Sequence, residues 1–129
     1  MINMSAQVTI NTDKYIRNLG LLRVIVGTAA GQVASEAQKS LEPHGQYNFY
    51  PNPPHWSSPP GTPPNSNLGF LAGSIKPKMI GATEAEVRVH QEYGLPLEMG
   101  TSTMAARPFM KPALDKVKPI FIMAVKGVL

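Results

Sequence analysis

The sequence predicts a single α+β domain in which a long N-terminal helix and a C-terminal helix pack on a small antiparallel β-sheet. Apolar residues recur every three or four positions over residues 13–41 and again over 110–128, which is the period of an amphipathic helix. Residues 70–80 and 84–93 instead alternate between apolar and polar side chains, which is typical of half-buried strands. The 129 residues, of which 43% are hydrophobic, suit one domain (residues 1–129) with a modest core.

The N-terminal part combines a short strand with a long helix. Residues 5–11 alternate and predict the strand, after which Asn11 or Thr12 can cap the helix of residues 13–41. The apolar stripe of this helix consists of Tyr15, Ile16, Leu19, Leu22, Val26, Ala30, Val33, Ala37 and Leu41. Three glycines, each costing up to about 1 kcal/mol relative to alanine, indicate that the helix needs a partner surface. They are Gly20, Gly27 and Gly31.

A proline-rich segment follows the helix. Residues 42–67 hold eight of the 13 prolines, and proline removes an amide donor and fixes φ, so we expect a long loop at about residues 43–67. Loops of this length are usually functional or disordered. Four aromatic residues in it can dock either onto a partner or onto the protein's own surface, and both alternatives stay open. They are Tyr47, Phe49, Tyr50 and Trp56.

The two alternating segments predict an antiparallel hairpin with one face in water. In residues 70–80, Pro77 indicates an edge strand or a bulge. In residues 70–80, Leu71, Gly73, Ile75 and Met79 are expected to share one face of the strand. In residues 84–93, the residues expected to face inward are Ala85, Val87, Val89 and Tyr93. Those expected to face water in the second strand are Glu84, Glu86, Arg88, His90 and Glu92.

The C-terminal helix follows a cluster of prolines. Pro108 and Pro112 suit its first turn, and Phe109 is expected to anchor it in the core. Pro119 falls within the helical pattern and predicts a kink or a break. The apolar face consists of Met110, Ala113, Leu114, Val117, Phe121, Ala124, Val125 and Val128.

Charge is unevenly distributed along the chain. The net charge is +4, with acidic residues concentrated in residues 84–98 and basic ones in 105–129. This asymmetry fits head-to-tail contact between identical subunits, a basic face on nucleic acid, or simply a solvated surface. The candidate DNA-facing residues are Lys111, Lys116 and Lys118. No segment has the roughly 18 consecutive apolar residues of a membrane span, so we expect no membrane partner.

No motif in the sequence indicates catalysis. Cysteine is absent, and the spacing of His44, His55 and His90 does not suggest a metal site. There is no Gly-x-Ser-x-Gly turn, phosphate-binding loop or dinucleotide fingerprint. We therefore expect no enzymatic activity, no metal and no cofactor.

Two stretches, in this order, resemble a family of phage proteins. SSPPGTPPNSNLGFLAGSI, residues 57–75, and YGLPLEMGTSTMAARPFMKPAL, residues 93–114, are similar to motifs of the tail-completion and head–tail joining proteins of long-tailed bacteriophages. The second stretch, with its Glu-x-Gly-Thr and Ala-Arg-Pro-Phe steps, is the more specific. The sequence departs from the family pattern at residues 66–69, where Ser-Asn-Leu-Gly stands in place of Thr-Gly, and at Met99, where the family has an aromatic residue.

The resemblance implies a structural role in the virion. Family members are small α+β subunits that form a ring, often sixfold, between the head connector and the tail tube, and DNA passes through the ring. The implied partners are other copies of the chain, head-completion or connector proteins, and tail-terminator or tail-tube proteins. The implied location is the head–tail interface or the tail, after assembly in the host cytoplasm. A small nucleic-acid-binding protein with nonspecific DNA contact is the alternative.

Residues 93–109 are interpreted as a structural corner and a candidate interface. Tyr93 is expected to pack inward. Glu98 is expected either to accept hydrogen bonds from nearby amides or to pair with Arg107 across the turn. Gly100 is expected to adopt a backbone angle that other residues resist, and Thr101 to hydrogen-bond to the local backbone.

Overall fold

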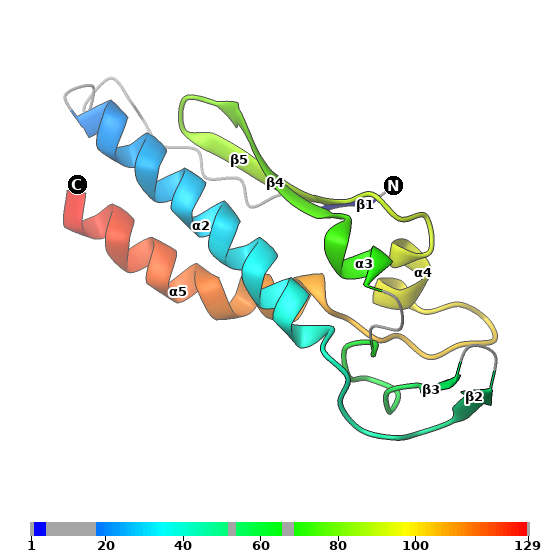
Figure 1. Cartoon of the computed structure of the whole chain (residues 1–129). Helices are drawn as coiled ribbons and strands as arrows, with labels where there is room; N and C mark the ends of the chain where they lie inside the picture. The colour runs from blue at the N-terminus through cyan, green and yellow to red at the C-terminus, as the bar shows by residue number, and fades with distance from the viewer. Residues whose placement is uncertain (1, 5–17, 52–53, 66–68, 129) are drawn as a thin grey trace.

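Two long helices and a three-stranded sheet form the body of the molecule. The computed structural model describes residues 2–4, 18–51, 54–65 and 69–128. Helix α2 (Leu19–Ser40) and helix α5 (Met110–Val128) lie side by side and antiparallel, and the sheet lies against α2 on the side away from α5 (Figure 1). The predicted α+β class is confirmed.

Helix α2 forms the centre of the core because it contacts both α5 and the sheet. Its buried face consists of Leu22, Val26, Ala29, Ala30, Val33, Ala34 and Ala37. These residues fall at helical spacing and many are small, which allows close approach: a side chain at Gly27 would already touch the sulfur of Met79 on the sheet. The predicted strand of residues 5–11 and the predicted helix start at residues 13–17 lie outside the described residues.

The sheet has the order β1-β5-β4, and both pairings are antiparallel. Its strands are β1 (Ile2–Met4), β4 (Ile75–Gly81) and β5 (Glu84–Val89). The predicted hairpin is confirmed, with Ala85, Val87 and Val89 buried. The predicted edge position of Pro77 is also confirmed, because β4 is an edge strand, and it carries a register shift between Met79 and Gly81.

Both predicted strands are longer than the observed ones. Residues 70–73 form a short helix, α3 (Phe70–Gly73), which follows Gly69 with its positive φ. Strand β5 ends at Val89, and helix α4 (Gly94–Met99) begins shortly after it. The prediction that Tyr93 packs inward is therefore wrong, and its side chain is about half exposed. Glu86 was expected in water but is buried, with its carboxylate 2.6 Å from Nε of Arg88.

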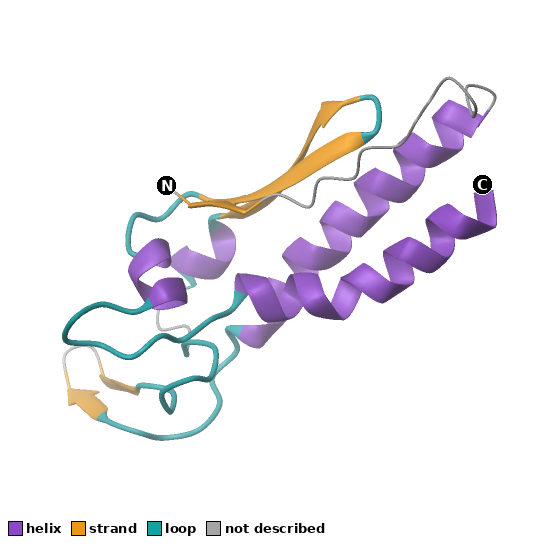
Figure 2. Ribbon diagram, turned by 180° about the vertical axis from the view of Figure 1, so that it is seen from behind, coloured by secondary structure: helices purple, strands orange, loops and turns teal. Residues whose placement is uncertain are grey.

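The proline-rich loop contains regular structure, contrary to the prediction. A two-stranded antiparallel sheet is formed by β2 (Phe49–Pro51) and β3 (Pro54–Trp56). It lies at the end of the molecule opposite the start of α2 and the end of α5 (Figure 2). Proline is tolerated here because each strand of a two-stranded sheet is an edge, so amide donors are not needed on the outer side.

Helix α5 continues through Pro119, so of the predicted kink or break the break is wrong. Pro119 lies on the exposed side, where water can satisfy the carbonyl that its ring frees. Pro108 lies two residues before the helix rather than within it, whereas Pro112 is in the first turn as predicted. Phe109 is fully buried, which confirms its predicted place in the core.

Candidate functional site

Glu98 joins helix α4 to the start of helix α5. Its Oε2 accepts hydrogen bonds from the main-chain amides of Phe109 (2.8 Å) and Met110 (3.0 Å), and its Oε1 accepts one from the amide of Lys111 (3.0 Å). A buried carboxylate thus satisfies amides that have no partner within the helix and lies at the positive end of the helix dipole. Of the two predicted roles for Glu98, bonding to amides is confirmed and pairing with Arg107 is wrong.

The turn after α4 depends on Gly100. Its φ of 78° and ψ of 169° lie in a region open almost only to glycine. A Cβ there would also lie 2.9 Å from the main-chain nitrogen of Ala106. The hydroxyl of Thr101 accepts a bond from the amide of Thr103 at 3.3 Å. The roles predicted for Gly100 and Thr101 are both confirmed.

Arg107 connects this corner to the proline-rich loop. Its Nε donates to the main-chain oxygen of Ser58 at 3.1 Å, and the amide of Gly61 donates to the main-chain oxygen of Ala106 at 2.9 Å. These bonds join segments almost fifty residues apart in the sequence. The loop backbone is therefore held against its own chain. The four loop aromatics remain exposed, so whether they dock onto a partner or onto the protein's own surface stays a prediction.

Asn65 holds the two arms of the loop together. Its Oδ1 accepts from the amide of His44 at 2.7 Å, while its Nδ2 donates to the main-chain oxygens of Gly45 (3.2 Å) and Trp56 (2.9 Å). The side chain thus adds to the backbone hydrogen bonds of Ser57 with Tyr47 and Asn48, which also join the two arms. Asn65 was not predicted as a site residue, because an asparagine after two prolines looks like any loop residue.

The small sheet holds two pairs of aromatic rings, one on each face of the hairpin. Tyr50 pairs with His55 across the strands, with ring centroids 5.3 Å apart and nearly parallel planes. Phe49 pairs with Trp56, with centroids also 5.3 Å apart but tilted. Because successive residues of a strand point to opposite faces, the two pairs lie on opposite sides of the hairpin.

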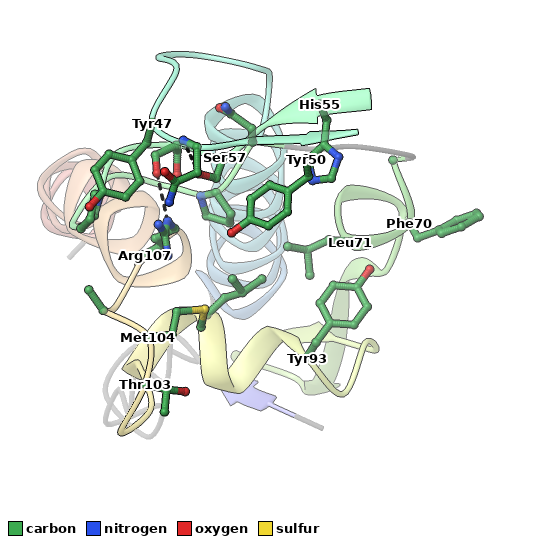
Figure 3. A pocket seen from close by; sticks show the side chains of 18 residues that line it. Tyr47, Tyr50, His55, Ser57, Phe70, Leu71, Tyr93, Thr103, Met104 and Arg107 are labelled. Atoms are coloured by element: carbon green, nitrogen blue, oxygen red, sulfur yellow. Dashed lines mark hydrogen bonds between the residues drawn. The ribbon is translucent and has the colours of Figure 1, made fainter. Parts of the chain in front are cut away.

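A pocket of about 640 Å³ opens between the loop and the corner. It brings together Tyr47 and Tyr50 of the loop with Tyr93 and Arg107 of the corner, and does not include Phe49 or Trp56. Figure 3 shows the ring of Tyr50 directed into the pocket, Arg107 between Tyr47 and Met104, and Phe70 pointing outward. Tyr47, Tyr50, Tyr93 and Arg107 were predicted from the sequence as site residues, but nothing in the sequence indicated that they meet. Ser58, Phe70, Leu97 and Met104, which also line the pocket, were not predicted.

The lysines predicted to face DNA lie elsewhere, along α5. Lys111 pairs with Asp115 one turn further on (3.3 Å), and Lys116 pairs with Glu36 of α2 (2.9 Å). The hydrogen bond from Lys116 holds the pKa of Glu36 below its usual value. Two of the three lysines therefore already have anionic partners, and Lys118 is exposed.

Comparisons with protein families, with curated proteins and with solved structures gave no match. Among the described residues, no three histidine or acidic side chains gather in a way that could hold a metal ion. No helix in the described part of the chain is long and apolar enough to cross a membrane.

Proposed function

We propose that the protein is a structural subunit of the head–tail junction or tail of a long-tailed bacteriophage and that it assembles into a ring through which DNA passes. The sequence motifs of residues 57–75 and 93–114 support the phage role. The further support from the structure is a helix segment that the described residues leave largely exposed. In this proposal the subunit binds its neighbours and sets the geometry of the ring, and it does not catalyse a reaction.

The observation that supports assembly is the exposed apolar surface on the second half of α5. Residues 119–125, PIFIMAV, are apolar on every side of the helix, yet α2 covers only one side. Ile120 is 57% exposed and Met123 is 75% exposed. A helix that is apolar all round is normally buried, so this segment favours contact with another subunit.

The position of this segment favours a ring over a twofold dimer. Residues 119–125 lie toward the end of the molecule where α2 begins and α5 ends, and the loop with β2 and β3, which contributes to the lining of the pocket, lies at the opposite end (Figure 1). Two different surfaces at opposite ends suit head-to-tail contacts, which close into a ring when the rotation between subunits allows it. The nucleic-acid-binding alternative gains no comparable support, because Lys111 and Lys116 are already paired.

Native mass measurement and negative-stain imaging of the purified chain test this proposal. We expect a closed oligomer with a central opening, and we expect Met123→Glu to dissociate it without unfolding the subunit, since the side chain is already exposed. Gln32→Glu, which adds the same charge at an exposed position of α2, is the matched control and should leave the oligomer intact. A monomer at every concentration, with no ring on adding tail-tube protein, would count against the proposal.

A further inference from the structure

Arg107 holds a cationic group in the pocket and has no acidic partner among the described residues. Its Nε is committed to the main-chain oxygen of Ser58, which leaves the two terminal nitrogens of the guanidinium for other contacts. Among the described residues no carboxylate lies within ion-pair distance of it, and none of those that line the pocket is acidic. Glu98, nine residues earlier, is occupied by three amides at the start of α5, and Asp115, eight residues later, pairs with Lys111.

The walls around Arg107 are apolar and aromatic. Tyr47, Tyr50 and Tyr93 are each about half exposed although they are large, and Leu97 and Met104 lie among the other lining residues, which include the polar Ser57 and Thr103. Pockets of 300–1,000 Å³ that combine apolar walls with a few polar groups are typical binding sites, and 640 Å³ falls within that range. Aromatic side chains and arginine are also the residues that most often dominate protein–protein binding.

We propose that this pocket binds an extended segment of a partner protein that carries a carboxylate beside an aromatic side chain. The carboxylate pairs with the terminal nitrogens of Arg107, a geometry that guanidinium groups favour. The neighbouring aromatic side chain packs among the tyrosines. This inference goes beyond the ring proposal, because it does not depend on the oligomeric state.

The charge of the site favours a peptide over single-stranded nucleic acid. Nucleic-acid grooves combine stacking aromatics with a row of cationic side chains that follows the phosphates. Here Arg107 is the single lysine or arginine among the described lining residues, and the lysines of α5 do not line the pocket. One guanidinium matches one carboxylate.

Calorimetric titration of the full chain with two blocked peptides tests the proposal. One peptide is Gly-Ser-Glu-Phe-Ser-Gly, and the other has glutamine in place of glutamate. We expect the glutamate peptide to bind at least about tenfold more tightly, as hydrogen bonds to a charged group imply. Equal affinity for the two peptides, or no binding of either, would overturn the proposal.

Matched variants locate the site. Arg107→Gln should remove the preference for glutamate, whereas Arg23→Gln, at an exposed arginine of α2, should keep it. Since Arg107 also holds the loop, Tyr50→Ala provides a second test: it should weaken both peptides and leave the thermal unfolding of the chain nearly unchanged. Wild-type affinity in Tyr50→Ala would contradict the assignment. Tighter binding of hexathymidylate, lost in Arg107→Gln, would overturn it in favour of a nucleic-acid site.

Discussion

The carboxylate of Glu98 accepts a hydrogen bond of 2.8 Å from the main-chain amide of Phe109, eleven residues further along the chain. Together with the bonds from Met110 and Lys111, this contact fixes where α5 begins. Phe109 is fully buried, so the same corner places an aromatic anchor in the core and caps the helix that follows it. The corner, residues 93–109, is therefore a structural unit, and several of its residues line the pocket.

Loss of the Glu98 carboxylate should destabilise the protein strongly. Glu98→Ala removes the acceptor for three amides, two of them in buried hydrogen bonds, and we expect it to lower the free energy of unfolding by about 2 kcal/mol or more. Glu98→Gln keeps one acceptor oxygen and should cost less. Urea denaturation measures both, with Glu92→Ala at an exposed glutamate as the control. A loss below about 0.5 kcal/mol for Glu98→Ala would show that water replaces the carboxylate.

Alanine at Gly100 should be unfavourable for two reasons. The backbone conformation there is nearly restricted to glycine, and the added Cβ would meet the main chain of Ala106 at 2.9 Å. We expect Gly100→Ala to cost about 1–3 kcal/mol in thermal or urea unfolding. Gly31→Ala is the contrasting control, because that glycine lies within α2 with open space around it and should gain up to about 1 kcal/mol. The same sign for both substitutions would contradict this account.

Truncation of Phe109 should leave a large cavity. The side chain is 0% exposed and belongs to the main core cluster, so Phe109→Ala is expected to cost about 3–5 kcal/mol. Phe70→Ala is a matched control, since Phe70 is 63% exposed and its loss should cost well under 1 kcal/mol. Equal losses at the two positions, measured by urea unfolding, would show that burial does not explain the role of Phe109.

The sequence predicts the core well where one periodicity extends over many residues. Ala85, Val87 and Val89 follow a strict period of two, and all are buried as predicted. The prediction failed where the pattern continued past the element. Tyr93 keeps the alternation although β5 ends at Val89, and Pro96 in the first turn of a short helix was the competing signal.

The pocket could not be predicted because it depends on contacts between distant segments. Tyr50 and Arg107 were both singled out, but nothing in their spacing places them around one cavity. Their meeting depends on the bond from Arg107 to Ser58 and on the side chain of Asn65, which is paired with loop backbone. Short-range sequence patterns carry no information about such bonds. Candidate residues could therefore be named from the sequence, but the pocket that they form could be recognised only in the folded structure.

Removal of Asn65 should loosen the loop without unfolding the core. In Asn65→Ala the amide of His44 loses its acceptor, so its hydrogen exchange should accelerate, while exchange at buried positions of α2 stays unchanged. Asn65→Asp keeps that acceptor but loses the donor to Gly45 and Trp56, so it should protect the His44 amide better than alanine does. Asn48→Ala, at an exposed asparagine of the same loop, is the control. Unchanged exchange in Asn65→Ala would show that the loop is held by other contacts.

The pair between Glu36 and Lys116 should couple the two long helices only when the glutamate is ionised. The hydrogen bond from Lys116 lowers the pKa of Glu36 in the folded state, so the stabilising contribution is fully present above the ordinary glutamate pKa of about 4.3. It is lost as the pH falls through the lower folded pKa. A double-mutant cycle with Glu36→Gln and Lys116→Met, measured by urea unfolding, should show a small coupling at pH 7 that disappears in strong acid and weakens in high salt, because the pair is at the surface. A coupling that persists undiminished in strong acid would mean that the two side chains interact by packing rather than charge.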